Sequence, residues 1–179
     1  MLDLSKGQVI ELKKEDGSAV TKIRVGGGWD TSKSGKANFD LDLSAICNDG
    51  SVCYFSKKEL PGISLDKDNV TGEGSGADEN MHFDASKMTA KKVLICINIF
   101  NAASKGQSFR DVENAFIEIE DKDTKKMLAK YNISADGGAN DALLAGELEV
   151  VNGAFKFTAK GVYAVGDLNQ LVAQFKPTV

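Results

Sequence analysis

The sequence predicts a mainly β protein in which antiparallel strands form a sandwich or a barrel, with two short peripheral helices. Short segments in which apolar and polar residues alternate recur along the whole chain, and a period of two is typical of strands with one buried face. Turn-forming tripeptides such as Asn48-Asp49-Gly50 and Val151-Asn152-Gly153 separate several of these segments, which favours hairpins over long crossovers. The 179 residues suffice for one domain with its own core, so we treat 1–179 as a single domain.

The predicted elements follow from these patterns in chain order. The alternating segments, each expected to be a strand, are residues 9–13, 21–25, 38–46, 52–56, 93–100, 115–120, 127–133, 143–150 and 155–159. One helix is expected at residues 108–114, with Ser108 as its N-cap. A second is expected at residues 168–175, where Asp167 is the N-cap and apolar residues recur at i, i+3, i+4 and i+7.

Charge is concentrated in one part of the chain. The formal net charge is −4, and residues 66–84 hold six acidic residues against one lysine, so the rest of the chain is close to neutral. No basic stretch interleaved with aromatic residues is present, which argues against nucleic acid as a partner. No segment has the ~18 apolar residues of a membrane span, and the opening residues lack the pattern of a signal peptide. We therefore expect a cytoplasmic protein with no membrane span.

The acidic segment also contains the one long stretch without clear periodicity, residues 61–84, and long loops of this kind are usually functional. Its centre reads Asp68-Asn69-Val70-Thr71-Gly72-Glu73-Gly74-Ser75-Gly76-Ala77-Asp78-Glu79. Calcium prefers such oxygen-bearing side chains, and glycines let the backbone fold tightly around an ion. The spacing does not fit an EF-hand, and a phosphate-binding loop would not end in two acids. The alternative is an acidic surface loop without a ligand.

A second acidic feature lies on the predicted strand 38–46. Side chains at i and i+2 share a face of a strand, so Asp40 and Asp42 stand on one side, together with Asn38 and Ser44. Same-face neighbours are about 7 Å apart, which leaves room for a cation between them. Like charges so placed repel each other unless a positive charge compensates them.

Three further residue types have less specific interpretations. His82 is the only histidine; it could pair with Asp84 or Glu79, and a surface or partly buried imidazole is favoured over a metal ligand. Trp29 follows three glycines and is expected to be a core anchor and not a stacking platform for a ligand. The three cysteines have no metal-binding spacing and are expected to be reduced thiols. The alternative is a disulfide between Cys47 and Cys53, which flank a turn and could face each other across a hairpin.

Several motifs occur in a fixed order along the chain. They are Leu4-Ser5-Lys6-Gly7, Gly28-Trp29-Asp30, Phe39-Asp40-Leu41-Asp42-Leu43-Ser44-Ala45, the acidic glycine segment 68–79, Ile97-Asn98-Ile99, Gln107-Ser108-Phe109-Arg110-Asp111-Val112-Glu113-Asn114-Ala115-Phe116, Gly146-Glu147-Leu148 and Phe155-Lys156-Phe157. Together they cover nearly the whole chain and closely resemble the TerD family of tellurium-resistance and general stress proteins.

This resemblance implies an antiparallel β-sandwich that holds Ca²⁺ between the Asp-Leu-Asp strand and the acidic glycine loop. Carried over by position, the implied ligands are Asp40, Asp42, Asp68, Asn69, Thr71, Glu73, Gly74, Asp78 and Glu79. Glu147 is a weaker candidate, and Asp30 is weaker still. The family commonly has aspartate where this chain has Ser75 and Ala77, and glycine where it has Lys67, so we expect at least one calcium site and leave a second open.

Three functional hypotheses remain at this stage. The first is a calcium-binding stress-response and tellurite-resistance protein, a binding or scaffolding module whose partners are calcium ions and other stress-complex proteins. The second is a metal-dependent hydrolase that uses the same carboxylates and keeps open coordination positions. The third is a metal-free structural subunit. No Ser-His-Asp or Cys-His set stands out, and carboxylates that stay ionised to hold calcium are poor general acids, so we expect no enzyme activity.

Overall fold

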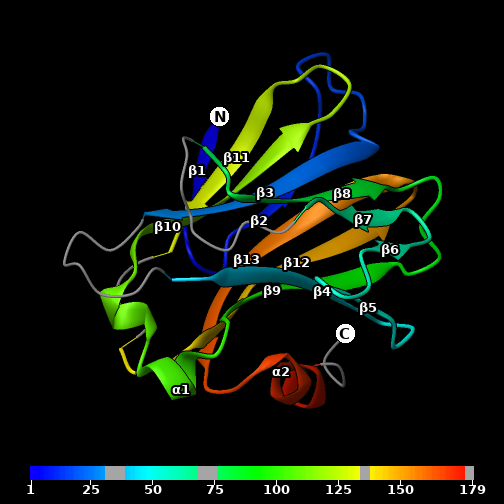
Figure 1. The fold of residues 1–179 in the computed structure, drawn as a ribbon. Coiled ribbons are helices and arrows are strands. Elements are labelled where there is room, and N and C mark those ends of the chain that lie inside the picture. The colour runs from blue at the N-terminus through cyan, green and yellow to red at the C-terminus, as the bar shows by residue number, and fades with distance from the viewer. Residues whose placement is uncertain (31–38, 68–75, 134–137, 176–179) are drawn as a thin grey trace.

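The computed structural model describes residues 1–30, 39–67, 76–133 and 138–175, which form two β-sheets packed face to face, with helices at one side (Figure 1). This confirms the predicted antiparallel β-sandwich. The first sheet has seven strands in the order β1-β11-β10-β3-β8-β7-β6. These strands are β1 (Leu2–Leu4), β3 (Lys22–Asp30), β6 (Glu59–Leu60), β7 (Ile63–Leu65), β8 (Glu79–Asp84), β10 (Glu113–Asp121) and β11 (Met127–Asn132).

The second sheet has six strands in the order β2-β13-β12-β9-β4-β5. They are β2 (Val9–Glu11), β4 (Leu41–Cys47), β5 (Val52–Cys53), β9 (Lys92–Ile99), β12 (Ala142–Val151) and β13 (Ala154–Ala164). Neighbouring strands are antiparallel, except that β1 runs parallel to β11. Hairpins join β4 to β5, β10 to β11 and β12 to β13, where the expected turn residues occur.

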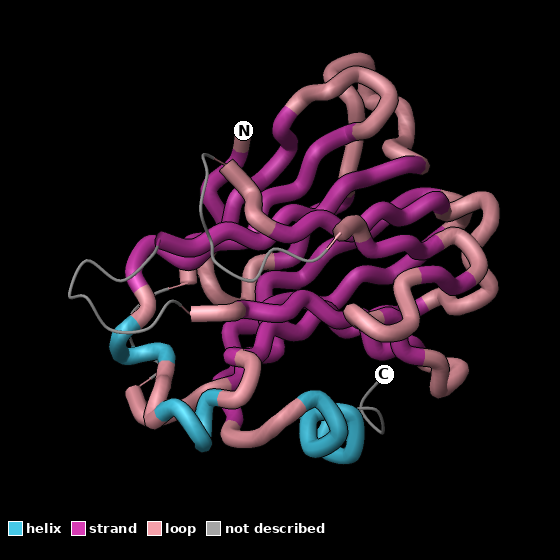
Figure 2. Tube along the Cα trace, in the orientation of Figure 1, coloured by secondary structure: helices cyan, strands magenta, loops and turns pink. Residues whose placement is uncertain are grey.

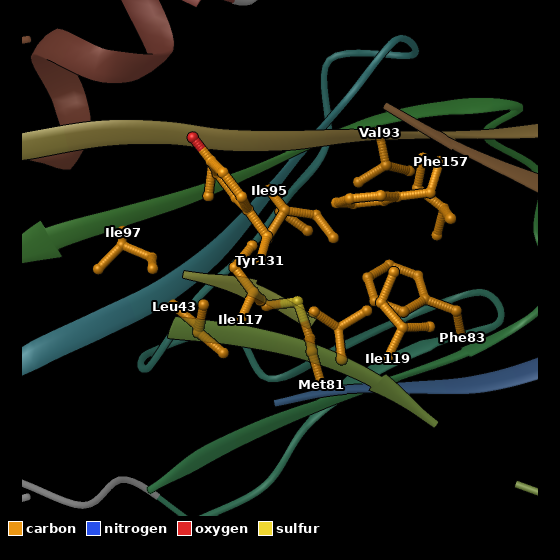
Figure 3. Packing of buried hydrophobic residues seen from close by; sticks show 14 of the residues in the cluster. Leu43, Met81, Phe83, Val93, Ile95, Ile97, Ile117, Ile119, Tyr131 and Phe157 are labelled. Atoms are coloured by element: carbon orange, nitrogen blue, oxygen red, sulfur yellow. The ribbon is translucent and has the colours of Figure 1, made fainter. Parts of the chain in front are cut away.

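The main core fills the space between the sheets. In Figure 3, Leu43, Ile95 and Phe157 from the second sheet face Met81 and Ile119 from the first. A smaller apolar cluster lies on the outer face of the second sheet, beneath the C-terminal helix α2 (Leu168–Phe175). The predicted cap of α2 is confirmed, because the Asp167 carboxylate accepts a hydrogen bond from the Gln170 N–H. None of the helices in the described ranges is long and apolar enough to cross a membrane.

The structure differs from the sequence prediction at four elements. Strand β3 continues through Gly26-Gly27-Gly28 to Asp30, beyond the predicted end at residue 25. Strand β8 lies within the stretch that showed no clear periodicity. The predicted helix at 108–114 is wrong, since only a 3₁₀ turn (Phe109–Asp111) forms before β10 begins, and Ser108 makes no side-chain cap. A short helix that was not predicted, α1 (Ala102–Lys105), comes directly after β9 (Figure 2).

Candidate metal centre

The acidic segment is attached at both ends to the first sheet. On its N-terminal side, the Asp66 N–H donates to the Asn80 carbonyl across 2.9 Å. On its C-terminal side, the Asp78 N–H donates to the Gly27 carbonyl at 2.8 Å, and the Asp78 carboxylate accepts from the Trp29 N–H at 3.0 Å. Both ends of the segment are therefore fixed beside β3 and β8.

Glu79, the first residue of β8, points between the sheets. It is 2% exposed, and its Oε2 accepts a hydrogen bond of 2.7 Å from the Leu43 N–H on β4. This N–H is available because β5 pairs with β4 only at Ala45 and Ile46. Gly27 faces Leu43 closely, since a Cβ there would lie 3.3 Å from the Leu43 side chain. A buried carboxylate thus joins the two sheets next to the acidic segment.

Asp40 and Asp42 are also buried, at 9% and 5% exposure. Asp42 lies on β4 between Leu41 and Leu43, which both face the core, so its side chain is on the outer face of the sheet. Asp40 precedes the strand, and its carbonyl accepts a hydrogen bond from the Phe100 N–H, which ties it to the end of β9. The Asp-Leu-Asp strand predicted from the alternation is confirmed, although β4 begins at Leu41 and not at residue 38.

Three carboxylates are buried near the start of β4, but on different faces: Glu79 contacts Leu43 between the sheets, whereas Asp42 is on the outer face. Burying carboxylates is costly unless hydrogen bonds or positive charge compensate them. The neighbouring Asp78 is partly buried, and burial raises the pKa of its carboxyl, partly offset by the Trp29 N–H hydrogen bond. The nearby Asp30 charge raises this pKa further. A cation close to Asp78 would therefore favour the ionised form of its carboxyl.

The remaining predicted ligands fall into two groups. Asp68, Asn69, Thr71, Glu73 and Gly74 lie outside the described residues. Within the described ranges, no group of three His, Cys, Asp or Glu side chains is arranged to hold a metal ion. A metal site here would therefore need additional oxygen ligands from the acidic segment.

Glu147 is not brought together with the other acids. It pairs in register with Leu94, which pairs in turn with Ile46, so it lies two strands from β4 and four residues along from Asp42. Four residues of strand span roughly 13 Å. Its carboxylate instead lies 3.6 Å from the Lys160 ammonium.

Sequence reasoning missed the part played by the glycines before Trp29. A Cβ on Gly26 would lie 2.6 Å from the Ala77 Cβ, and one on Gly28 would lie 3.0 Å from the Gly76 carbonyl oxygen. The end of the acidic segment thus crosses β3 where β3 has no side chains. Three consecutive glycines in an otherwise alternating segment were the available signal, because a strand glycine often marks a close backbone approach.

The structure also shows the positions of Trp29, His82 and the three cysteines. Trp29 is 4% exposed and donates from its indole N–H to the Phe39 carbonyl at 3.1 Å, which confirms a core position. His82 is partly buried and pairs with neither Asp84 nor Glu79 but with Asp66, 3.0 Å from its Nε2. Cys47, Cys53 and Cys96 are buried free thiols.

Comparison with known proteins identifies the family to which this fold belongs. Residues 1–175 match the family model described as the TerD domain. The chain belongs to the TerD family. It is 34% identical to the tellurium resistance protein TerD of Alcaligenes sp, over 97% of this chain and 96% of the relative. It is 33% identical to general stress protein 16U of Bacillus subtilis (strain 168), with the same coverage of both chains.

Solved structures of TerD-like proteins share the fold. A homologue of telluride resistance protein (TerD) from Streptomyces coelicolor superimposes with a TM-score of 0.68 at 20% identity, over 86% of this chain and 95% of the other. The β-sandwich is therefore the TerD architecture, and the chain is a member of a tellurium-resistance and general stress protein family.

Proposed function

We propose that this TerD protein binds Ca²⁺ between the start of β4 and the acidic segment, and that the ion orders that segment against the sandwich. The observation that carries the proposal is the burial of Asp40 and Asp42 at the start of β4, which the Glu79–Leu43 hydrogen bond connects to the C-terminal end of the segment. Buried carboxylates at such a place gain most from a divalent cation, because the cation supplies the positive charge that water no longer provides.

The chemistry of the proposed donors suits calcium. Ca²⁺ takes six to eight oxygen ligands, whereas the described carboxylates near the site are too few to complete such a shell. Asp40 and Asp42 at the start of β4 would hold the ion from the sandwich side, while Asp78 and Glu79 attach the end of the acidic segment to β3 and β4. Asp68, Asn69, Thr71, Glu73 and the Gly74 carbonyl would supply the remaining oxygens. Glu147 is no longer part of the proposed set, since it lies away from the others.

The proposed role is that of a non-enzymatic binding or scaffolding module in the cytoplasm. Its partners would be other proteins of the stress response, which recognise the surface that the calcium-bound segment presents. Relatives named for tellurium resistance and general stress support this setting. An ion that organises a surface needs a filled coordination shell and no open position for a substrate, which distinguishes this role from that of a hydrolase.

A thermal melt tests the proposal. A ligand that binds only the native state stabilises it by RT ln(1 + [L]/Kd), or about 2.7 kcal/mol at a hundredfold excess over Kd. Chelator-treated protein should therefore melt at a higher temperature in millimolar calcium than in equal magnesium. Asp42→Asn should lose this shift, and Asp16→Asn, in an exposed turn, should keep it.

The rival function is tested in the same samples. A metal-dependent hydrolase should turn over a simple phosphoester such as p-nitrophenyl phosphate when calcium, magnesium or manganese is added. We expect no turnover above that of Asp42→Asn. Metal-dependent turnover that Asp42→Asn abolishes would replace the scaffold with the hydrolase, and equal melting temperatures with and without calcium would remove the calcium site.

A further inference from the structure

Both helices lie on one side of the molecule, along the outer face of the second sheet (Figure 2). A cavity of about 980 Å³ opens on this face. Its floor is formed by the ends of β4 and β9. Its walls are formed by α1, by the first turn of α2 and by residues 54–56, which follow β5. A concave site of this size is large enough for a small-molecule ligand or a protruding side chain.

The floor of the cavity contains a buried hydrogen-bond acceptor. Asn98 on β9 is 5% exposed, and its Oδ1 has no hydrogen-bond partner among the described residues. A buried amide oxygen without a hydrogen-bond partner is energetically unfavourable. Because Asn98 lines the cavity, a ligand that donates an N–H or O–H there would satisfy this oxygen.

The charges around the cavity select the kind of donor. Its described lining includes Asp42, Asp141 and Asp167 but no lysine, arginine or histidine. The Asp167 carboxylate caps α2, so its negative charge interacts mainly with the N-terminus of that helix. Asp141 accepts one hydrogen bond of 2.7 Å from the Gly166 N–H, and Asp42 lies directly opposite Asn98 in register. The cavity is therefore negative, which favours a cationic donor.

Aromatic side chains line the cavity as well. Phe55 and Phe100 are 38% and 37% exposed, and their rings pack edge to face with centroids 5.9 Å apart. Both belong to the lining. Exposed aromatic rings next to carboxylates can cover the apolar part of a ligand and also attract a cation to their faces.

We propose that this cavity binds an organic cation, namely an amidinium, guanidinium or primary ammonium group on an apolar body. The Asn98 Oδ1 and the Asp141 carboxylate accept its N–H groups, and Phe55 and Phe100 cover its apolar part. A free amine or an arginine or lysine side chain of a partner protein carries this same chemistry. The inference does not depend on calcium binding, although Asp42 borders both sites.

The test uses benzamidine as the cationic probe and benzamide as its neutral analogue. Both are titrated into the ¹⁵N-labelled full chain in chelator, so that calcium plays no part. Benzamidine should cause saturable amide shifts that centre on Asn98, Phe100 and Asp141, and benzamide should bind at least about tenfold more weakly, a difference of 1.4 kcal/mol. Equal binding of the two probes, or shifts elsewhere on the molecule, would overturn the proposal.

Two variants make the test specific. Asp141→Asn removes the charge but keeps an oxygen for the Gly166 N–H, and Asn98→Leu removes the buried acceptor. Each should weaken benzamidine binding by about tenfold or more, whereas Asp16→Asn should leave it unchanged. The spectrum of each variant reports whether it folds. If Asn98→Leu does not fold, the binding of benzamidine to Asp141→Asn alone tests the proposal. Unchanged binding in a folded Asp141→Asn would overturn the proposal.

A final comparison identifies the source of the cation. Butylguanidine presents one guanidinium on a free alkyl chain, and N-acetyl-arginine-amide presents the same single charge on a protein-like backbone. Tighter binding of butylguanidine would assign the cavity to small free cations, and tighter binding of the arginine amide would assign it to a partner's side chain. If neither binds, the cavity does not take alkyl guanidinium groups, and the proposal fails for this class.

Discussion

Glu79 on β8 and Leu43 on β4 are joined by a hydrogen bond of 2.7 Å between the glutamate Oε2 and the backbone N–H, which connects the two sheets of the sandwich through its interior. A charged side chain at an inward position of a strand is unusual. Glu79 follows Asp78, where the acidic segment returns to the first sheet, and its partner Leu43 follows Asp42 on β4 of the second sheet. The same bond therefore fixes the relative position of both carboxylate-bearing elements.

This relationship predicts a difference between two substitutions at Glu79. Glu79→Ala removes the acceptor and leaves the Leu43 N–H buried without its partner, so the free energy of unfolding in chelator should fall by about 1–3 kcal/mol. Glu79→Gln keeps an acceptor oxygen and should lose less stability, while calcium binding should fall in both variants. Urea denaturation measures the first effect, and equal losses of stability in the two variants would show that the hydrogen bond is unimportant.

The glycines of β3 predict a double-mutant effect. In Gly26→Ala the new Cβ would lie 2.6 Å from the Ala77 Cβ, which is attached to the backbone and cannot rotate away. We expect a loss of about 1–3 kcal/mol, typical of overpacking. Combining it with Ala77→Gly should restore part of this loss, because the clash with Ala77 disappears while that with Arg24 Nη1, at 2.5 Å, remains. A strictly additive result in urea denaturation would mean that the two residues do not contact each other.

The cysteines predict a clear chemical result. Burial raises the pKa of the Cys47 and Cys53 thiols to about 11 and that of Cys96 to about 12, because it disfavours the thiolate. At pH 8 only roughly a thousandth or less of each thiol is ionised. Ellman's reagent should therefore react slowly with the native protein and rapidly with all three thiols in guanidinium chloride. A single reactive thiol after denaturation would instead indicate a Cys47–Cys53 disulfide.

The mostly buried ion pairs of Arg24 should contribute more to the free energy of unfolding than an exposed ion pair does. The Arg24 guanidinium, with 16% of the side chain exposed, contacts Glu118 at 2.9 Å and Glu120 at 3.2 Å. Arg24→Gln leaves two neighbouring glutamates without their common cation and should cost about 1–3 kcal/mol. The matched control is Lys13→Gln, which breaks an exposed pair with Glu11 and should cost no more than about 1 kcal/mol. Equal losses in urea denaturation would contradict this reading.

Much of the fold was predictable, because the strands and turns of a sandwich have regular sequence patterns. Strands with one buried face alternate, as at β10 and β13, and the hairpin turns are rich in Asn, Asp and Gly. Strand β8 was missed although Met81 and Phe83 alternate with polar residues, because its first inward residue is Glu79. The extension of β3 was missed because glycine has low strand propensity, and here it serves the passage of the acidic segment.

The candidate site was only partly predictable. The outward position of Asp42 on β4 follows from strand periodicity, but the placement of Glu79 depends on how the two sheets approach each other, which no local pattern specifies. Glu147 carries the same chemistry and yet lies elsewhere, because β12 is two strands from β4. The predicted helix at 108–114 failed for a similar reason, since the chain must become extended at Glu113 to enter β10.

The central claim is that calcium binds at the start of β4, and equilibrium dialysis of chelator-treated protein against radioactive calcium tests it most directly. The measurement should give at least one ion per chain, undiminished by equal magnesium. Binding should be lost in Asp42→Asn and retained in Asp16→Asn. Absence of bound calcium in the wild-type protein, or full binding in Asp42→Asn, would contradict the claim.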